Sequence, residues 1–162
     1  MSIATMKVEF VHPFVEGAFR VLRETVQASP RRGPLSLRTG NTFTSQELTT
    51  LIGVNGDIEG VALYGMSLIA AQKIAGKLLG MALTEFDELA SSAIAEVANM
   101  ITGNATTELE QNGYHCDITP PSMLRGIGTE ITTSVPALIV PIITEFGDME
   151  INLALAPSMR RG

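Results

Sequence analysis

Residues 91–103 read SSAIAEVANMITG, and the apolar positions of this stretch recur every three or four residues. That spacing is typical of a helix with one buried side. Carried back to residue 86 at about 100° per residue, the same pattern forms one broad apolar arc. The arc consists of Phe86, Leu89, Ala90, Ala93, Ile94, Val97, Met100 and Ile101. We therefore predict a long amphipathic helix whose apolar arc faces the core.

A separate stripe of polar and small residues follows another side of the same predicted helix. Its members are Ser92, Glu96, Asn99 and Gly103, spaced four, three and four residues apart. Residues at these spacings are neighbours on a helix surface, with Cβ atoms about 5–6 Å apart. The stripe joins a carboxylate to a carboxamide, with the small side chain of Ala95 beside them. This geometry predicts that Glu96 and Asn99 face a second protein, for which the small residues leave room.

An ordinary solvated helix face is the alternative interpretation of the stripe. Two observations favour a partner surface. Asn is a mediocre helix former, yet Asn99 stands in the middle of the helix. A solvated face usually carries Lys, Glu and Gln, whereas small residues border this stripe. Gly103 costs about 0.5–1 kcal/mol relative to Ala inside a helix, so we expect either a bend there or the close approach of another backbone.

The composition favours one acidic globular domain. Of the 162 residues, 45% are hydrophobic, which is enough for a single domain over residues 1–162 with a real core. We expect residues 1–5 and 158–162 to be poorly ordered tails. The net charge of −6 and the pI near 4.9 argue against a nucleic-acid partner. The sequence has no run of 18 consecutive apolar residues, so no membrane span is expected. A single cysteine, Cys116, fits a reducing, cytoplasmic location.

The order of predicted elements is helix, three strands, two helices and about four strands. The expected segments are helix 13–27, loop 28–33, strand 34–39, hairpin 46–66, helix 67–79, the long helix from Thr84 to about residue 112, strands 118–124 and 128–135, and hairpin 137–155. Strands joined by tight turns pair antiparallel. The fold class is therefore α+β, with helices packed on an antiparallel sheet.

Turn and capping residues support several of these boundaries. Asn55-Gly56 predicts a tight hairpin turn in which both residues have positive φ. Ser67 is a good N-cap for helix 67–79, and Gly80 can end it. The adjacent prolines 120 and 121 predict a strand edge or bulge, because neither can donate a ladder hydrogen bond.

Metal and nucleophile chemistry are poorly supported by the sequence. His12 and His115 stand 103 positions apart, and His115 and Cys116 would point to opposite faces of a strand. No metal site is therefore predicted. Cys116 has no recognisable base partner. The chain contains neither a G-x-x-x-x-G-K-[ST] phosphate-binding loop nor a G-x-G-x-x-G motif that opens a helix.

The block DELASSAIAEVANMITGNA resembles the CheC, CheX and FliY family of chemotaxis phosphatases, and the CheX type in particular. The family pattern of Ser or Asp, then Glu, then Asn, falls here on Ser92, Glu96 and Asn99. A proline follows at Pro121, one residue short of the usual spacing. MKVEFVHPFVEGAFRVL and ALYGMSLIAAQKIAGKLLGM are also similar to the family, so the resemblance spans residues 6–157. CheC proteins carry two Glu-x-x-Asn sites, whereas this chain has one, so helix 13–27 is expected to be structural.

The resemblance implies an antiparallel sheet packed against three helices, the longest of which carries the Glu-x-x-Asn motif. It implies hydrolysis of the aspartyl phosphate on a CheY-like response regulator. Asn99 is then expected to position the attacking water, and Glu96 to grip a lysine of the regulator. Ser92, Ala95 and Gly103 are expected to line the contact. Mg²⁺ is expected on the regulator, with no metal or cofactor held by this chain, and a homodimer is expected.

A non-catalytic module of the same fold, which docks a receiver domain or a flagellar-switch component, is the alternative hypothesis. The intact pair of Glu96 and Asn99 favours the enzyme. A purely structural protein leaves the stripe of small residues without an explanation. The sequence assigns no role to Cys116 or to loop 28–33, and it does not identify the regulator.

Overall fold

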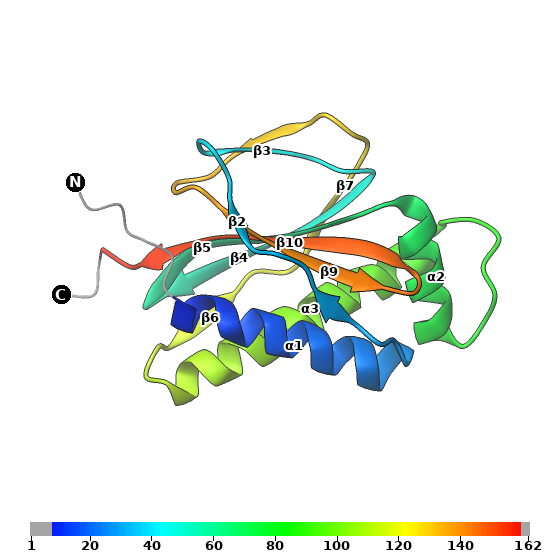
Figure 1. The fold of residues 1–162 in the computed structure, drawn as a ribbon, viewed down its shortest axis with the longest axis horizontal. Coiled ribbons are helices and arrows are strands. Elements are labelled where there is room, and N and C mark those ends of the chain that lie inside the picture. Colours follow the sequence, from blue (N-terminus) through cyan, green and yellow to red (C-terminus); the bar gives the residue numbers. More distant parts are fainter. Residues whose placement is uncertain (1–7, 160–162) are drawn as a thin grey trace.

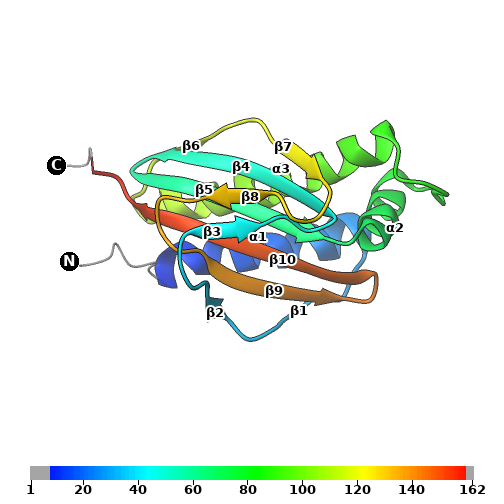
Figure 2. The same cartoon turned by 90° about the horizontal axis from the view of Figure 1, so that it is seen from above.

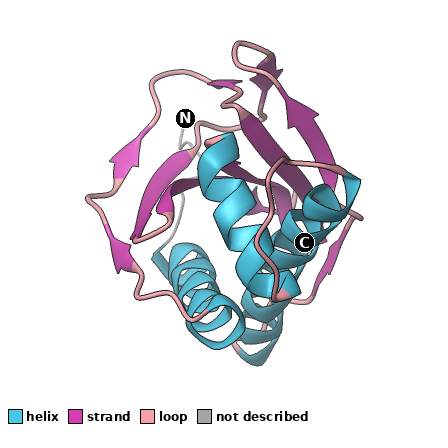
Figure 3. Cartoon of the chain, turned by 90° about the vertical axis from the view of Figure 1, so that its right-hand side faces the viewer, coloured by secondary structure: helices cyan, strands magenta, loops and turns pink. Residues whose placement is uncertain are grey.

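A computed structural model describes residues 8–159 of the chain. Its elements are α1 (Val8–Val26), β1 (Arg31–Arg32), β2 (Ser36–Leu37), β3 (Thr42–Thr44), β4 (Leu48–Gly56), β5 (Ile58–Met66), α2 (Leu68–Leu79), α3 (Glu88–Gln111), β6 (Cys116–Ile118), β7 (Ser122–Arg125), β8 (Glu130–Thr132), β9 (Leu138–Thr144) and β10 (Gly147–Pro157). The predicted α+β class is confirmed, with three helices packed beside one another (Figure 3).

The sheet has eight strands, and every pairing in it is antiparallel. Its order is β1-β9-β10-β5-β4-β6, with β2 also on β9 and β7 also on β4. The predicted hairpins form the centre of the sheet, because β10 pairs with β5 along its length. Helices α1 and α3 lie on one side of this sheet (Figure 1). A separate pair, β3 and β8, lies over the other side (Figure 2).

The first hairpin is confirmed, but its turn differs from the prediction. The β4–β5 ladder ends at the pair Val54 and Gly60. Gly56 has a φ of 118°, whereas Asn55 does not have a positive φ. The end of β4 pairs with β6 instead, since Asn55 lies opposite Asp117. A third strand thus competes for the residues that a two-residue turn would use.

The caps of α2 are as predicted. The Ser67 side chain accepts a hydrogen bond from the Ala70 N–H at 3.1 Å, and Gly80 ends the helix with a φ of 70°. Helix α3 begins later than predicted, because Asp87 and not Thr84 is its N-cap. The Asp87 side chain accepts the Ala90 N–H at 2.9 Å.

Helix α1 begins earlier than the predicted start at residue 13. Pro13 lies inside the helix and not in its first position. The added turn packs apolar surface, since Phe10 is fully buried and meets the ring of Tyr114 edge-on at 5.2 Å. Burial of this kind outweighs the one backbone hydrogen bond that proline removes.

The predicted tails fall mostly outside the described residues, except for Ser158 and Met159. Residues 1–5 and 160–162 lie outside the described part of the structure. Ser158, placed in the expected C-terminal tail, is buried, and its N–H donates to the Asp57 carbonyl at 2.9 Å. The packed part of the domain therefore extends to Ser158.

The placement of α3 depends on two close contacts. The buried Tyr64 hydroxyl lies 2.6 Å from the Thr102 hydroxyl, which donates to the Ala98 carbonyl at 2.7 Å. On the neighbouring side, a Cβ built at Gly17 of α1 would lie 2.9 Å from the Ile101 carbonyl oxygen. The first contact joins α3 to β5, and the second lets α1 approach α3 closely.

Two glycine substitutions test this packing. Gly17→Ala forces the two helix backbones apart, which typically costs about 1–3 kcal/mol, so we expect a lower free energy of unfolding in urea titrations. Gly103→Ala is the matched control, because a Cβ there would meet nothing within 4 Å. It should raise the free energy of unfolding by about 0.5–1 kcal/mol. Equal effects of the two substitutions would contradict the close packing at Gly17.

Candidate functional site

The apolar arc of α3 is buried as predicted except at Met100, which is half-buried, and at Leu89. Ala90, Ala93, Ile94, Val97 and Ile101 are buried. Leu89 was predicted to be buried, but it is 50% exposed. Leu89 lies at the edge of the arc, about 20° of helix rotation from Glu96. The prediction was wrong because the packed side of α3 is narrower than its apolar pattern.

The predicted stripe lies along an accessible side of α3. Ser92 and Glu96 are exposed, and Ala95, Asn99 and Gly103 are half-buried. Within residues 8–159, no group forms a hydrogen bond or ion pair with the side chain of Glu96 or Asn99. The two side chains therefore keep their full hydrogen-bonding capacity for a group outside this chain.

Neighbouring polar residues on the same helix differ in this respect. The Asn104 amide donates to the Met100 carbonyl at 2.8 Å, and the Thr107 hydroxyl donates to the Gly103 carbonyl at 2.9 Å. These side chains bond to the backbone of their own helix. The contrast separates Asn99 from the other asparagine of α3.

The space above Gly103 is open. Because a Cβ at Gly103 would meet no atom within 4 Å, no backbone of the described chain approaches it. The sequence left two explanations for a glycine here, a bend in the helix or the close approach of another backbone. Residues 8–159 do not provide that second backbone.

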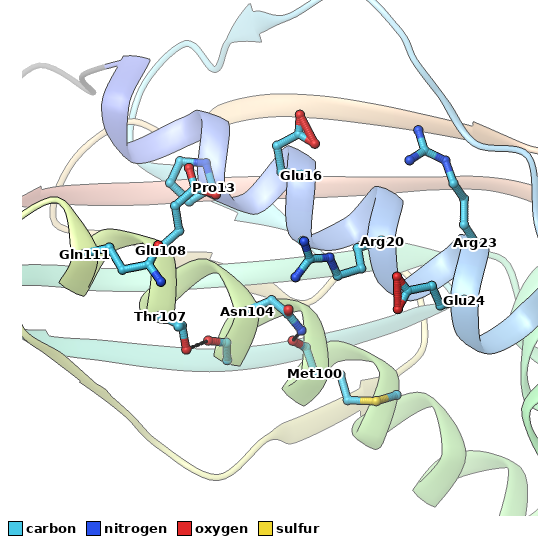
Figure 4. Close-up of a pocket in the computed structure, with 12 residues that line it drawn as sticks. Pro13, Glu16, Arg20, Arg23, Glu24, Met100, Asn104, Thr107, Glu108 and Gln111 are labelled. Atoms are coloured by element: carbon cyan, nitrogen blue, oxygen red, sulfur yellow. Dashed lines mark hydrogen bonds between the residues drawn. The ribbon is translucent and has the colours of Figure 1, made fainter.

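A groove of about 810 Å³ runs between α1 and α3 beside the stripe (Figure 4). Gly103 and Met100 belong to its lining, whereas Glu96 and Asn99 do not. In Figure 4 the side chains of Arg20 and Glu24 extend from α1 toward α3. Helix α1, expected to be structural, thus also lines a polar groove. The sequence pattern could not predict this, because the groove depends on how two helices lie against each other.

Pro120 and Pro121 lie where the predicted strand is interrupted, whereas a strand edge or bulge was expected there. The single strand expected over residues 118–124 is split into β6 and β7, which both pair with β4. Strand β7 lies beside the first turns of α3, where the Ser91 hydroxyl donates to the Met123 sulfur at 3.2 Å. Residues 119–121 therefore connect two strands on this side of α3.

Other chemically active side chains lie apart from the stripe. The exposed His115 ring contacts Glu110 at 2.7 Å, and this carboxylate raises the pKa of His115. Burial raises the pKa of the Cys116 thiol, which lowers its thiolate fraction near neutral pH. Among residues 8–159, no group of three or more His, Cys, Asp or Glu is placed to hold a metal ion. No described helix has the length and apolar character that a membrane span requires.

Comparisons with known proteins agree with this architecture. The sequence model of the family described as chemotaxis phosphatase CheX matches residues 48–143. The chain is 32% identical over 152 residues to the CheY-P phosphatase CheX of Thermotoga maritima, covering 93% of this chain and 97% of that protein.

Solved structures are also similar over most of their length. A CheC-like superfamily protein from a Shewanella species matches with a TM-score of 0.82 and 25% identity, covering 93% of this chain and 99% of that one. The CheX–CheY–BeF₃–Mg²⁺ complex from Borrelia burgdorferi matches with a TM-score of 0.74 and 26% identity, covering the same shares. The extent of these matches shows that the chain belongs to the CheX family of chemotaxis phosphatases.

Proposed function

We propose that this chain hydrolyses the aspartyl phosphate of a CheY-like response regulator in chemotaxis signalling. The observation that carries the proposal is the pair Glu96 and Asn99, accessible on α3 and without a bonding partner among residues 8–159. The similarity to the CheY-P phosphatase of Thermotoga maritima supports the same activity. The intact pair of Glu96 and Asn99 favours the enzyme over a docking module of the same fold.

Asn99 is suited to position the attacking water. An acyl phosphate is already reactive, so catalysis requires chiefly that a water lie in line with the bond that breaks. The Asn99 carboxamide can accept from that water and donate to it or to a phosphoryl oxygen. Held on a packed helix, it reaches the water with little freedom left to lose on binding.

Glu96 is suited to orient the regulator and not to touch the phosphoryl group, because like charges repel. Its exposed carboxylate can pair with a lysine ammonium on the regulator. Glu96 and Asn99 are three residues apart on one helix, so their Cβ atoms lie about 5–6 Å apart. The ion pair therefore fixes how the carboxamide enters the regulator's site.

Mg²⁺ belongs to the regulator in this proposal, where it supplies positive charge to the phosphoryl oxygens. The stripe offers one carboxylate, which does not make a metal site. The Borrelia burgdorferi complex holds Mg²⁺ together with BeF₃, a stand-in for the phosphoryl group, and with CheY. The single cysteine fits a reducing compartment, so we place the enzyme in the cytoplasm.

We also propose a homodimer formed through the side of the sheet away from α1 and α3. Exposed apolar side chains stand next to the β3–β8 pair in the chain: Leu37 is 63% exposed and Ile127 is 74% exposed. Contact between these regions of two chains buries apolar surface. The stripes on α3 then stay accessible, one on each chain.

Substitution of Asn99 tests the catalytic proposal. Asn99→Ala should lower the single-turnover rate of dephosphorylation by about 10²-fold or more, by loss of the positioned water. Its affinity for the regulator loaded with BeF₃ and Mg²⁺ should stay within about threefold of wild type. Asn104→Ala is the matched control, because the Asn104 amide bonds to its own helix. Full turnover by Asn99→Ala would remove this residue from the mechanism.

Neutralisation of Glu96 tests the proposed ion pair. Glu96→Gln keeps the shape of the side chain but should weaken regulator binding about 10-fold, since a charge-assisted contact is lost. Wild-type affinity should fall with added salt more steeply than the affinity of the variant. Glu110→Gln is the control, because Glu110 is an exposed carboxylate at the far end of α3. Equal salt dependence in wild type and Glu96→Gln would argue against the ion pair.

Light scattering at micromolar concentration tests the dimer. A dimer has about twice the chain mass of 17.3 kDa, and this is the mass we expect. Leu37→Glu should shift the protein toward monomer without a change in turnover per chain, because the charge is placed far from the stripe. A wild-type monomer would contradict the proposal.

A further inference from the structure

Leu89 extends the stripe by one position toward the start of α3. It precedes Ser92 by three residues, so Leu89, Ser92, Glu96, Asn99 and Gly103 are spaced three, four, three and four residues apart. This is the spacing with which a helix presents a seam to another surface. The seam therefore begins with a large apolar side chain that is 50% exposed.

The exposed Leu89 side chain lies on nearly the same side of α3 as Glu96. Seven residues separate them, which is about two helical turns, roughly 10 Å along the axis and about 20° of rotation. Met100 follows Glu96 by four residues and is half-buried at the edge of the α1–α3 groove. The Glu96 carboxylate thus stands between two apolar side chains along one side of α3.

We propose that Leu89 is an apolar docking contact for the phosphorylated response regulator. This inference rests on the proposed function and extends it toward the choice of regulator. The regulator must present an apolar side chain roughly 10 Å from the lysine that meets Glu96, and roughly 15 Å from its phosphorylated aspartate. A regulator with a charged residue at that place binds weakly, since Leu89 then buries that charge.

Leu89 and Met100 should strengthen the ion pair of Glu96, in addition to adding buried apolar area to the interface. Apolar side chains that close around a charged contact exclude water from it and strengthen the attraction between the charges. The contribution of Leu89 should therefore depend on the charge at residue 96. A side chain that merely covered unrelated surface would add independently of that charge.

Exposure by itself does not mark a docking residue, because single exposed leucines are common. Ile69 on α2 is 68% exposed, but it is not part of the α3 seam. Ile69→Ala therefore removes a comparably exposed apolar side chain from a place outside the proposed interface. It is the matched control for Leu89→Ala.

The test measures the binding of CheY-type receivers from the organism that encodes the chain, each loaded with BeF₃ and Mg²⁺. With the tightest binder, Leu89→Ala should raise the Kd about 5- to 10-fold, as expected for the loss of a half-exposed leucine contact. Leu89→Met should bind within about twofold of wild type. Ile69→Ala should not change the Kd, and the melting temperature of Leu89→Ala should match wild type.

A double-mutant cycle adds a readout specific to the ion pair. The loss of affinity in Leu89→Ala with Glu96→Gln should be smaller than the product of the two single losses. An unchanged Kd in Leu89→Ala, or losses that multiply, would overturn the inference. Failure of the wild-type chain to dephosphorylate a receiver that it binds would instead overturn the proposed function, because the Kd measurement does not depend on turnover.

Discussion

The rotation of α3 about its own axis is the constraint on which the rest of the site depends. One side of the helix is packed against the sheet, where the buried Tyr64 hydroxyl contacts Thr102 at 2.6 Å. The close approach of α1 at Gly17 fixes a second side. Because the sheet and α1 together fix the rotation of α3, the side with Glu96 and Asn99 points away from the core. The fold thus sets the direction of both side chains before any partner binds.

Hydrogen bonding inside α3 then distinguishes residues that the sequence alone treats alike. Asn104 and Thr107 bond to carbonyls of their own helix. Glu96 and Asn99 have no such partner among residues 8–159. A rigid helix with two unbonded polar groups is a suitable scaffold for a partner that brings the reactive group with it. It reduces the ordering that binding would otherwise require.

Local signals in the sequence were enough for the elements that depend on local physics. Apolar periodicity predicted α3, and Ser67 and Gly80 marked the ends of α2 where the structure has them. What failed depended on neighbours distant in sequence. Strand β6 takes residues that a tight turn at Asn55 would need, and the packed side of α3 is too narrow to bury Leu89. The α1–α3 groove and the β3–β8 pair likewise arise from contacts that no local pattern contains.

The central claim is that the Glu96 and Asn99 side of α3 enters the active site of the regulator. A crystal structure of the chain with its CheY-type receiver, BeF₃ and Mg²⁺ tests this most directly. The account predicts the Asn99 carboxamide at hydrogen-bond distance, about 3 Å, from a water in line with the beryllium atom. It also predicts the Glu96 carboxylate within about 4 Å of a lysine ammonium of the receiver. A complex in which the receiver binds elsewhere and leaves this side of α3 in solvent would contradict the account.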